Sequence, residues 1–224
     1  MVSDLFSIYT DSVRTRLTVM LAFLPLVQAQ DSLLLKSVEP RYDIYSEELA
    51  TDFDVASASV TITVLANGVP IALDKSSVPL PMAVVMALKE YEFRPQGGLP
   101  HGRPETEAGT YQVTLNVPIR QSKDPARVNP SAIRVRPGVA KGLLMKQVRP
   151  QYPEYARQNR IHGTVTLAAV ITEQGEVENL NISDGPFILI EAAYDAVKQW
   201  RHRPYLLNGR PIEWLTDIQV VFTN

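Results

Sequence analysis

The sequence predicts an α+β fold in which helices pack on one face of a small three-stranded antiparallel sheet, with this unit present as two tandem copies. Three observations support the prediction. Apolar residues alternate at every second position in several segments, two segments carry an apolar face at helical spacing, and short motifs recur 110 positions apart. Alternation is typical of half-buried strands, and the helical face indicates a helix that packs on them.

The composition is that of a folded globular protein, with 45% hydrophobic and 21% charged residues among 224. The net charge of −2 gives no electrostatic attraction to nucleic acid. The absence of cysteine excludes disulfides, thiolate zinc sites and a cysteine nucleophile. We therefore expect no cofactor, no nucleic-acid partner and no small-molecule substrate.

Residues 1–29 are expected to be a signal peptide or a short N-terminal apolar segment. Arg14 and Arg16 precede an apolar stretch from Leu17 to Val27, and Ala29 supplies the small residue before a cleavage site. The stretch is shorter than the ~20 residues of a membrane-spanning helix, and a buried helix is the alternative. We expect an exported, periplasmic protein, tethered to the inner membrane if this segment is not cleaved.

Two motifs occur twice in the chain. Pro40-Arg-Tyr42 is followed 110 positions later by Pro150-Gln-Tyr152, and the segment 87–95 is matched by 196–204, both ending in Arg-Pro. The apolar helix faces also correspond, with members Leu80, Val84, Ala87, Leu88 and Tyr91 in one and Leu189, Ala193, Ala196, Val197 and Trp200 in the other. A tandem duplication accounts for both, with a degenerate domain at 31–120, a linker at 121–140 and a second domain at 141–224.

Within the second domain, the pattern predicts a short helix over 153–159, a strand over 164–172 and a second strand over 177–182 with a bulge. Asp184 is expected to cap the following helix, and Pro204 to end it. Asn208-Gly209 predicts a turn. The last strand is expected to place one set of side chains on a common face, namely Trp214, Thr216, Ile218, Val220 and Phe222.

These residues together resemble the TonB C-terminal domain family. The resemblance runs from about 142 to 222 and combines Arg149-Pro-Gln-Tyr-Pro153 with Trp200-Arg-His-Arg-Pro204 and Asn208-Gly209. The upstream copy keeps fewer of these residues, chiefly Pro40, Tyr42, Gly68 and Arg94-Pro95.

The resemblance implies a periplasmic domain that couples an inner-membrane complex to outer-membrane transporters by pairing a strand with a short peptide of the transporter plug. The implied partner is an outer-membrane TonB-dependent receptor or another envelope protein, with self-association as a further expectation. The implied partner-binding residues are Arg149, Gln151, Tyr152, Trp214, Thr216, Ile218 and Val220.

The chain departs from energy transducers because a folded upstream copy stands in place of a long proline-rich spacer. An accessory or scaffolding envelope protein without an energy-transducing role is therefore the alternative, in which the final strand is already covered.

Several conspicuous side chains have a structural interpretation beside a functional one. Trp200 lies on the apolar helix face, which favours core packing. Arg201 and Arg203 either bind an acidic partner or complement the end of a helix. The three histidines lack metal-ligand spacing, and no nucleophile elbow or phosphate loop is present, so we expect neither a metal site nor an enzyme.

Overall fold

The computed structural model describes residues 33–42, 53–95, 109–122 and 133–223. The predicted signal peptide at 1–29 and half of the predicted linker at 121–140, namely residues 123–132, lie outside these ranges. In the described residues, no helix has both the length and the apolar character needed to cross a membrane.

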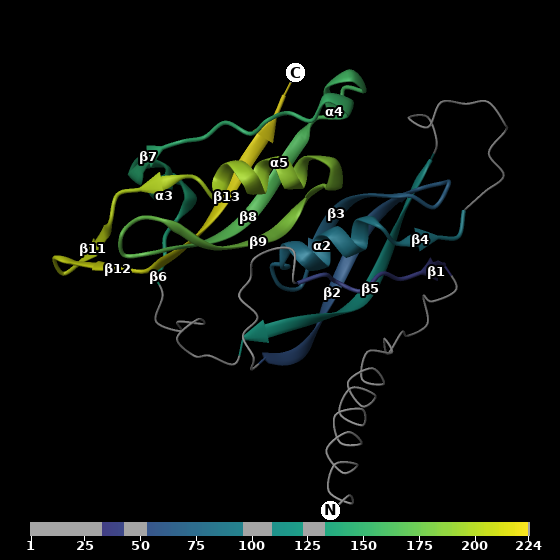
Figure 1. Ribbon diagram of the computed structural model, residues 1–224, viewed down its shortest axis with the longest axis horizontal. Helices are drawn as coiled ribbons and strands as arrows, with labels where there is room; N and C mark the ends of the chain where they lie inside the picture. Colours follow the sequence, from purple (N-terminus) through teal and green to yellow (C-terminus); the bar gives the residue numbers. More distant parts are fainter. Residues whose placement is uncertain (1–32, 43–52, 96–108, 123–132, 224) are drawn as a thin grey trace, which may run out of the picture.

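A seven-stranded sheet runs through the whole molecule (Figure 1). Its strands, in spatial order, are β5 (Thr110–Ser122), β2 (Phe53–Leu65), β3 (Pro70–Ser76), β9 (Val177–Pro186), β8 (Gly163–Ile171), β13 (Trp214–Phe222) and β6 (Ile133–Arg134). All neighbouring pairs are antiparallel except β13 and β6, which are parallel.

Three two-stranded pairs and four helices complete the described fold. The pairs are β1 (Leu34–Lys36) with β4 (Glu92–Phe93), β7 (Leu144–Lys146) with β10 (Arg201–His202), and β11 (Tyr205–Leu207) with β12 (Arg210–Ile212). The helices are α2 (Met82–Lys89), α3 (Pro137–Leu143), α4 (Glu154–Gln158) and α5 (Phe187–Val197).

The mixed α/β class is confirmed, but two separate three-stranded sheets are not found. β3 and β9 pair at Ala72–Leu73, and Leu80 and Ile182 exchange backbone hydrogen bonds of 2.7 and 2.8 Å. Leu80 and Ile182 are fully buried. The two halves merge because apolar side chains at their junction are removed from water only when the strands join.

The two halves share a common series of elements, to which the second half adds α4 after its first short strand and the β11–β12 hairpin before its final strand. Each runs through a short strand, two long antiparallel strands, a helix, a second short strand and a final long strand. In each half a glycine carbonyl accepts a hydrogen bond from the second short strand: Phe93 N–H donates to Gly68 at 3.1 Å, and His202 N–H donates to Gly175 at 2.8 Å. The final strands, β5 and β13, therefore lie toward opposite ends of the sheet.

Helices α2 and α5 cover the same face of the sheet and contact each other (Figure 1). The side chains that point toward them are buried, including Val165, Leu167, Ala169 and Ile171 of β8, as the alternation predicts. The opposite face carries mainly polar side chains that are exposed or half-buried. Each strand therefore contributes one apolar side to a single core.

The ends of α5 differ from the prediction. Asp184 belongs to β9 and makes no side-chain cap, because β9 continues to Pro186 and the helix begins at Phe187. The helix ends at Val197, well before Pro204, since Arg201 already pairs with Lys146 in the β10–β7 ladder. Strand pairing, rather than proline, ends the helix.

Three local predictions are confirmed. The short helix α4 follows Pro153. Asn208 and Gly209 have φ values of 52° and 79°, which suit a two-residue hairpin turn. The β8–β9 register shifts between Ala169 and Ile171, where a bulge was expected.

Candidate partner-binding surface

The final strand β13 has one side occupied and the other largely open. All nine residues pair with β8, from Trp214 opposite Ile171 to Phe222 opposite Gly163. On the other side, β6 pairs only with Trp214 and Leu215. Among the described residues, no strand continues this pairing, so the edge is open from residue 217 onward.

One hydrogen bond shows which backbone groups face this open side. Val135 N–H donates to the Leu215 carbonyl at 2.7 Å from the β6 side. Backbone direction alternates along a strand, so the N–H and C=O groups of Asp217, Gln219 and Val221 also face outward. The backbone N–H and C=O groups of Thr216, Ile218 and Val220 face β8, where they form the hydrogen bonds of the sheet.

The four β13 residues predicted to bind a partner present neither exposed side chains nor outward backbone groups. Trp214, Thr216, Ile218 and Val220 are at most 7% exposed, on the buried face of the sheet. They hold the strand in place, and the alternate residues between them carry the open edge. The alternation in the sequence distinguishes the apolar residues from the residues between them. The prediction chose the apolar residues as the partner-binding set.

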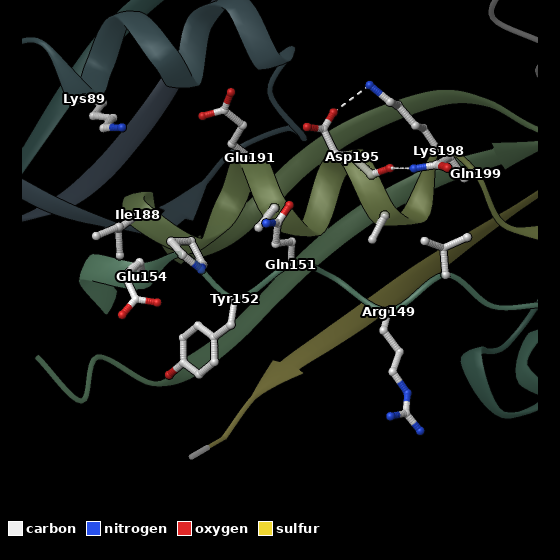
Figure 2. A pocket seen from close by; sticks show the side chains of 14 residues that line it. Lys89, Arg149, Gln151, Tyr152, Glu154, Ile188, Glu191, Asp195, Lys198 and Gln199 are labelled. Atoms are coloured by element: carbon white, nitrogen blue, oxygen red, sulfur yellow. Dashed lines mark hydrogen bonds and ion pairs between the residues drawn. The ribbon is translucent and has the colours of Figure 1, made fainter. Parts of the chain in front are cut away.

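The segment 147–153 crosses the sheet on the helix side and forms one wall of a groove (Figure 2). The groove has a volume of about 860 Å³ and lies between this segment and α5, with Lys89 of α2 also lining it. Arg149, Gln151 and Tyr152 are all part of this wall. The structure thus brings together the three segment residues that the sequence indicated.

Tyr152 anchors the segment to the end of the final strand. Its hydroxyl donates to the Ile161 carbonyl at 2.7 Å, and its ring lies 5.4 Å from the ring of Phe222. Both contacts are within the domain and leave Tyr152 half-buried. This geometry favours a positioning role, because the tyrosine ties the segment to β13.

Arg149 and Gln151 are exposed. In Figure 2, Arg149 points away from α5, on the side of the sheet where β13 forms the border. Within the described part of the chain, its guanidinium has no hydrogen bond or ion pair. It is a cation available to a partner that docks along this border.

The charged groups of the groove wall on α5 are partly paired. Lys198 binds Asp195 at 2.6 Å, and Gln199 donates to the Asp195 carbonyl at 2.7 Å. On the opposite wall, Glu154 accepts hydrogen bonds from Arg157 and Gln158, and these lower the pKa of its carboxyl. The groove therefore holds charges of both signs and no concentrated field.

Trp200 contacts the segment 147–153 from the core of the domain. The side chain is 7% exposed, and its indole N–H donates to the Val148 carbonyl at 2.9 Å. The prediction that Trp200 packs in the core is confirmed. Its hydrogen bond also holds the segment 147–153 in place. Arg201 has a structural contact too, since it pairs with Glu176 at 3.3 Å and donates to the Trp200 carbonyl at 2.9 Å.

A buried histidine, which the sequence did not single out, lies next to the final strand. His202 is 3% exposed, and its ring meets the edge of the Trp214 ring at 5.4 Å between centroids. Burial lowers the pKa of His202 to about 4, so the ring is neutral at pH 7. Among the described residues, no group of three or more histidines and carboxylates is placed to hold a metal ion.

Comparison with known proteins identifies the C-terminal part of the chain. Residues 148–223 match the family described as Gram-negative bacterial TonB protein C-terminal. A relative named "Protein TonB", from Vibrio cholerae serotype O1, is 35% identical over 82 residues. That alignment covers 36% of this chain and 34% of the relative, so the match spans about a third of the relative's length. The family match does not include the expected upstream copy at 31–120. The resemblance is confirmed where the match lies: residues 148–223 match the TonB C-terminal domain family.

Proposed function

We propose that this protein is a cell-envelope binding protein that takes an extended segment of an outer-membrane TonB-dependent receptor as an added strand on β13. The carrying observation is the row of outward backbone groups at Asp217, Gln219 and Val221, which have no strand beside them among the described residues. An edge of this kind offers both donors and acceptors to a guest chain.

The geometry limits how the guest strand lies. β6 already occupies the edge at Trp214 and Leu215, and Arg134 of β6 pairs with Asp217 at 2.7 Å. A guest strand therefore pairs from Asp217 toward Phe222, which is room for about six residues. Each new backbone hydrogen bond is worth about 0.5–1.5 kcal/mol, so the edge alone gives a modest affinity.

Arg149 is proposed to add to this affinity. It is exposed, unpaired among the described residues, and directed to the side of the sheet bordered by β13 (Figure 2). Charge-assisted hydrogen bonds from a guanidinium are stronger than neutral ones. A carboxylate or carbonyl of the partner beside the added strand would satisfy it.

The alternative is an accessory or scaffolding protein whose final strand is covered by the upstream half. The strand order supports the first proposal, because the upstream half joins through β3 and β9, on the other side of β8 from β13. Within the described residues, the two-residue β6 is the only strand that pairs with the outer side of β13.

The test is binding of synthetic peptides from the N-terminal plug segments of TonB-dependent receptors, measured by titration calorimetry. Gln219→Pro removes an outward N–H and should abolish binding. Thr114→Pro, on the strand at the opposite border of the sheet, is the matched control and should bind as wild type does. Equal binding by both variants, or no peptide binding by the wild type, would reject strand addition on β13.

We also infer that residues 31–120 are a degenerate TonB-like copy of the domain at 141–224, joined to it through residues 121–140, which also contribute β6 to the sheet. The shared element order and the equivalent Gly68–Phe93 and Gly175–His202 contacts support this. A periplasmic location follows from the proposed partner, and inner-membrane tethering would require that the leader is retained. N-terminal sequencing of the exported protein tests that point.

A further inference from the structure

The border of the sheet formed by β5 is the counterpart of the β13 border. β5 runs over 13 residues and pairs on one side with β2. Among the described residues, no strand pairs with its other side. We propose that this border joins two copies of the protein, with β5 of one copy antiparallel to β5 of the other.

Two contacts establish which β5 groups face outward. The Gly109 carbonyl accepts from Ala66 N–H at 2.8 Å, on the β2 side, whereas Arg120 N–H donates to the Tyr42 hydroxyl at 3.2 Å, away from β2. Alternation then places the backbone groups of Gln112, Thr114 and Asn116 on the outer side.

The far end of this border cannot extend the pairing. Pro118 is at an outward position and has no N–H, and Arg120 N–H is engaged by Tyr42. Pairing is therefore confined to the stretch before Pro118. A two-fold axis at Thr114 pairs the largest number of outward residues in this stretch. Gln112 of one copy then lies opposite Asn116 of the other, and the two Thr114 residues lie opposite each other.

The side chains beside this stretch do not obstruct a neighbour. Gln112 donates to Asp74 across β2 at 3.2 Å, and the Thr114 and Thr61 hydroxyls lie 3.0 Å apart. Both side chains thus lean inward over the sheet. Residues 110–117 carry no charge, so two copies meet without repulsion, and Thr–Thr pairs across strands are favourable.

A second copy fits this border better than a flexible peptide does. A peptide must be ordered on binding, at a cost of about 1–2 kcal/mol per residue. β5 is already held as a strand by its register with β2 from Thr110 to Ser122. Two preformed strands pay no such cost, and a two-fold axis makes the pairing self-limiting.

The experiment is sedimentation of the full chain across about a hundredfold range of concentration. Wild type should form a dimer, and Thr114→Pro should weaken it by about tenfold or more, since two hydrogen bonds across the axis are lost. Gln219→Pro, on the β13 border, should dimerise like wild type. A wild type that stays monomeric throughout, or a Thr114→Pro dimer of unchanged strength, would overturn the proposal.

A second variant separates misfolding from lost pairing. Thr114→Lys keeps the N–H but places two like charges opposite each other, so it should weaken the dimer in low salt and recover in high salt. Because the chain has no cysteine, Thr114→Cys alone should be joined to its copy by a short bismaleimide, whereas Gln219→Cys should not. Peptide binding at β13 is measured separately, so either proposal can fail without the other.

Discussion

The backbone N–H of Val135 donates to the Leu215 carbonyl at 2.7 Å, and this contact sets the orientation of the whole final strand. Since the backbone carbonyl of Leu215 faces the outer side of β13, the backbone N–H and C=O groups of every second residue after it face that side too. The open border therefore belongs to Asp217, Gln219 and Val221, and Ile218 belongs to the ladder with β8.

Proline at two adjacent positions of β13 should lower the stability by very different amounts. Ile218→Pro removes a hydrogen bond from the β8 ladder and should lower the free energy of unfolding by about 3 kcal/mol or more. Gln219→Pro removes an N–H that faces outward and should cost under about 1 kcal/mol. Urea denaturation of both variants measures this, and equal losses would show that the orientation of the strand is wrong.

Truncation of Trp200 should be among the most costly changes in the C-terminal domain. Trp200→Ala should lower the free energy of unfolding by roughly 3–5 kcal/mol, because a large buried side chain is lost. Trp200→Phe keeps most of the apolar contact but loses the hydrogen bond to the Val148 carbonyl, and should cost less. If Trp200→Ala melts as the wild type does, the side chain cannot be part of the core.

Tyr152 and Arg149 should separate into a positioning residue and a binding residue. Tyr152→Phe loses the hydrogen bond to the Ile161 carbonyl and should cost about 1 kcal/mol of stability. Arg149→Ala should leave the melting temperature unchanged and weaken peptide binding. Calorimetry of folding and of peptide binding on both variants checks this, and a stability loss for Arg149→Ala would contradict it.

The sequence predicts most of the C-terminal domain, because there the alternation is regular and the core lies on one side. Residues such as Val165 and Leu167 are buried as the pattern requires. It could not predict the junction of the two halves, since the pairing of β3 with β9 depends on contacts over 110 residues apart, such as that between Ala72 and Pro186.

The candidate site was predicted in part for a related reason. Arg149, Gln151 and Tyr152 follow one another closely, so a local motif was sufficient to group them. The open border of β13 depends instead on β6, two residues from the predicted linker that pair with Trp214 and Leu215. Periodicity separates two sets of side chains but does not say which set has its backbone at an edge.

The pH dependence of stability should report on His202. Its folded-state pKa of about 4 lies below the value of 6.5 expected in the unfolded chain. The unfolded state therefore binds the proton first, and stability is full above pH 6.5 and falls as the pH drops toward 4. The loss should be on the order of 1–3 kcal/mol.

His202→Phe should remove this pH-dependent loss, since Phe93 fills the corresponding place in the upstream half and is equally buried. Urea denaturation at pH 7 and pH 4.5 measures the difference. A wild-type loss that persists unchanged in His202→Phe would assign it to other groups.

Two glycines test whether the halves are built alike. Gly68 and Gly175 have φ values of 93° and 85°, and a Cβ on either would lie 2.1 Å from the Phe93 carbonyl oxygen or 1.8 Å from that of His202. Both distances are too short for any side chain, and the positive φ adds strain. Gly68→Ala and Gly175→Ala should each lower the free energy of unfolding by more than about 2 kcal/mol.

Gly209→Ala is the matched control, because its φ of 79° carries the same backbone strain but no atom lies within 4 Å of the added Cβ. It should cost only about 1 kcal/mol. Thermal and urea unfolding of the three variants provide the comparison. A loss at Gly175 without a similar loss at Gly68 would mean that the upstream half does not depend on the same close approach, and the inferred duplication would lose its best structural support.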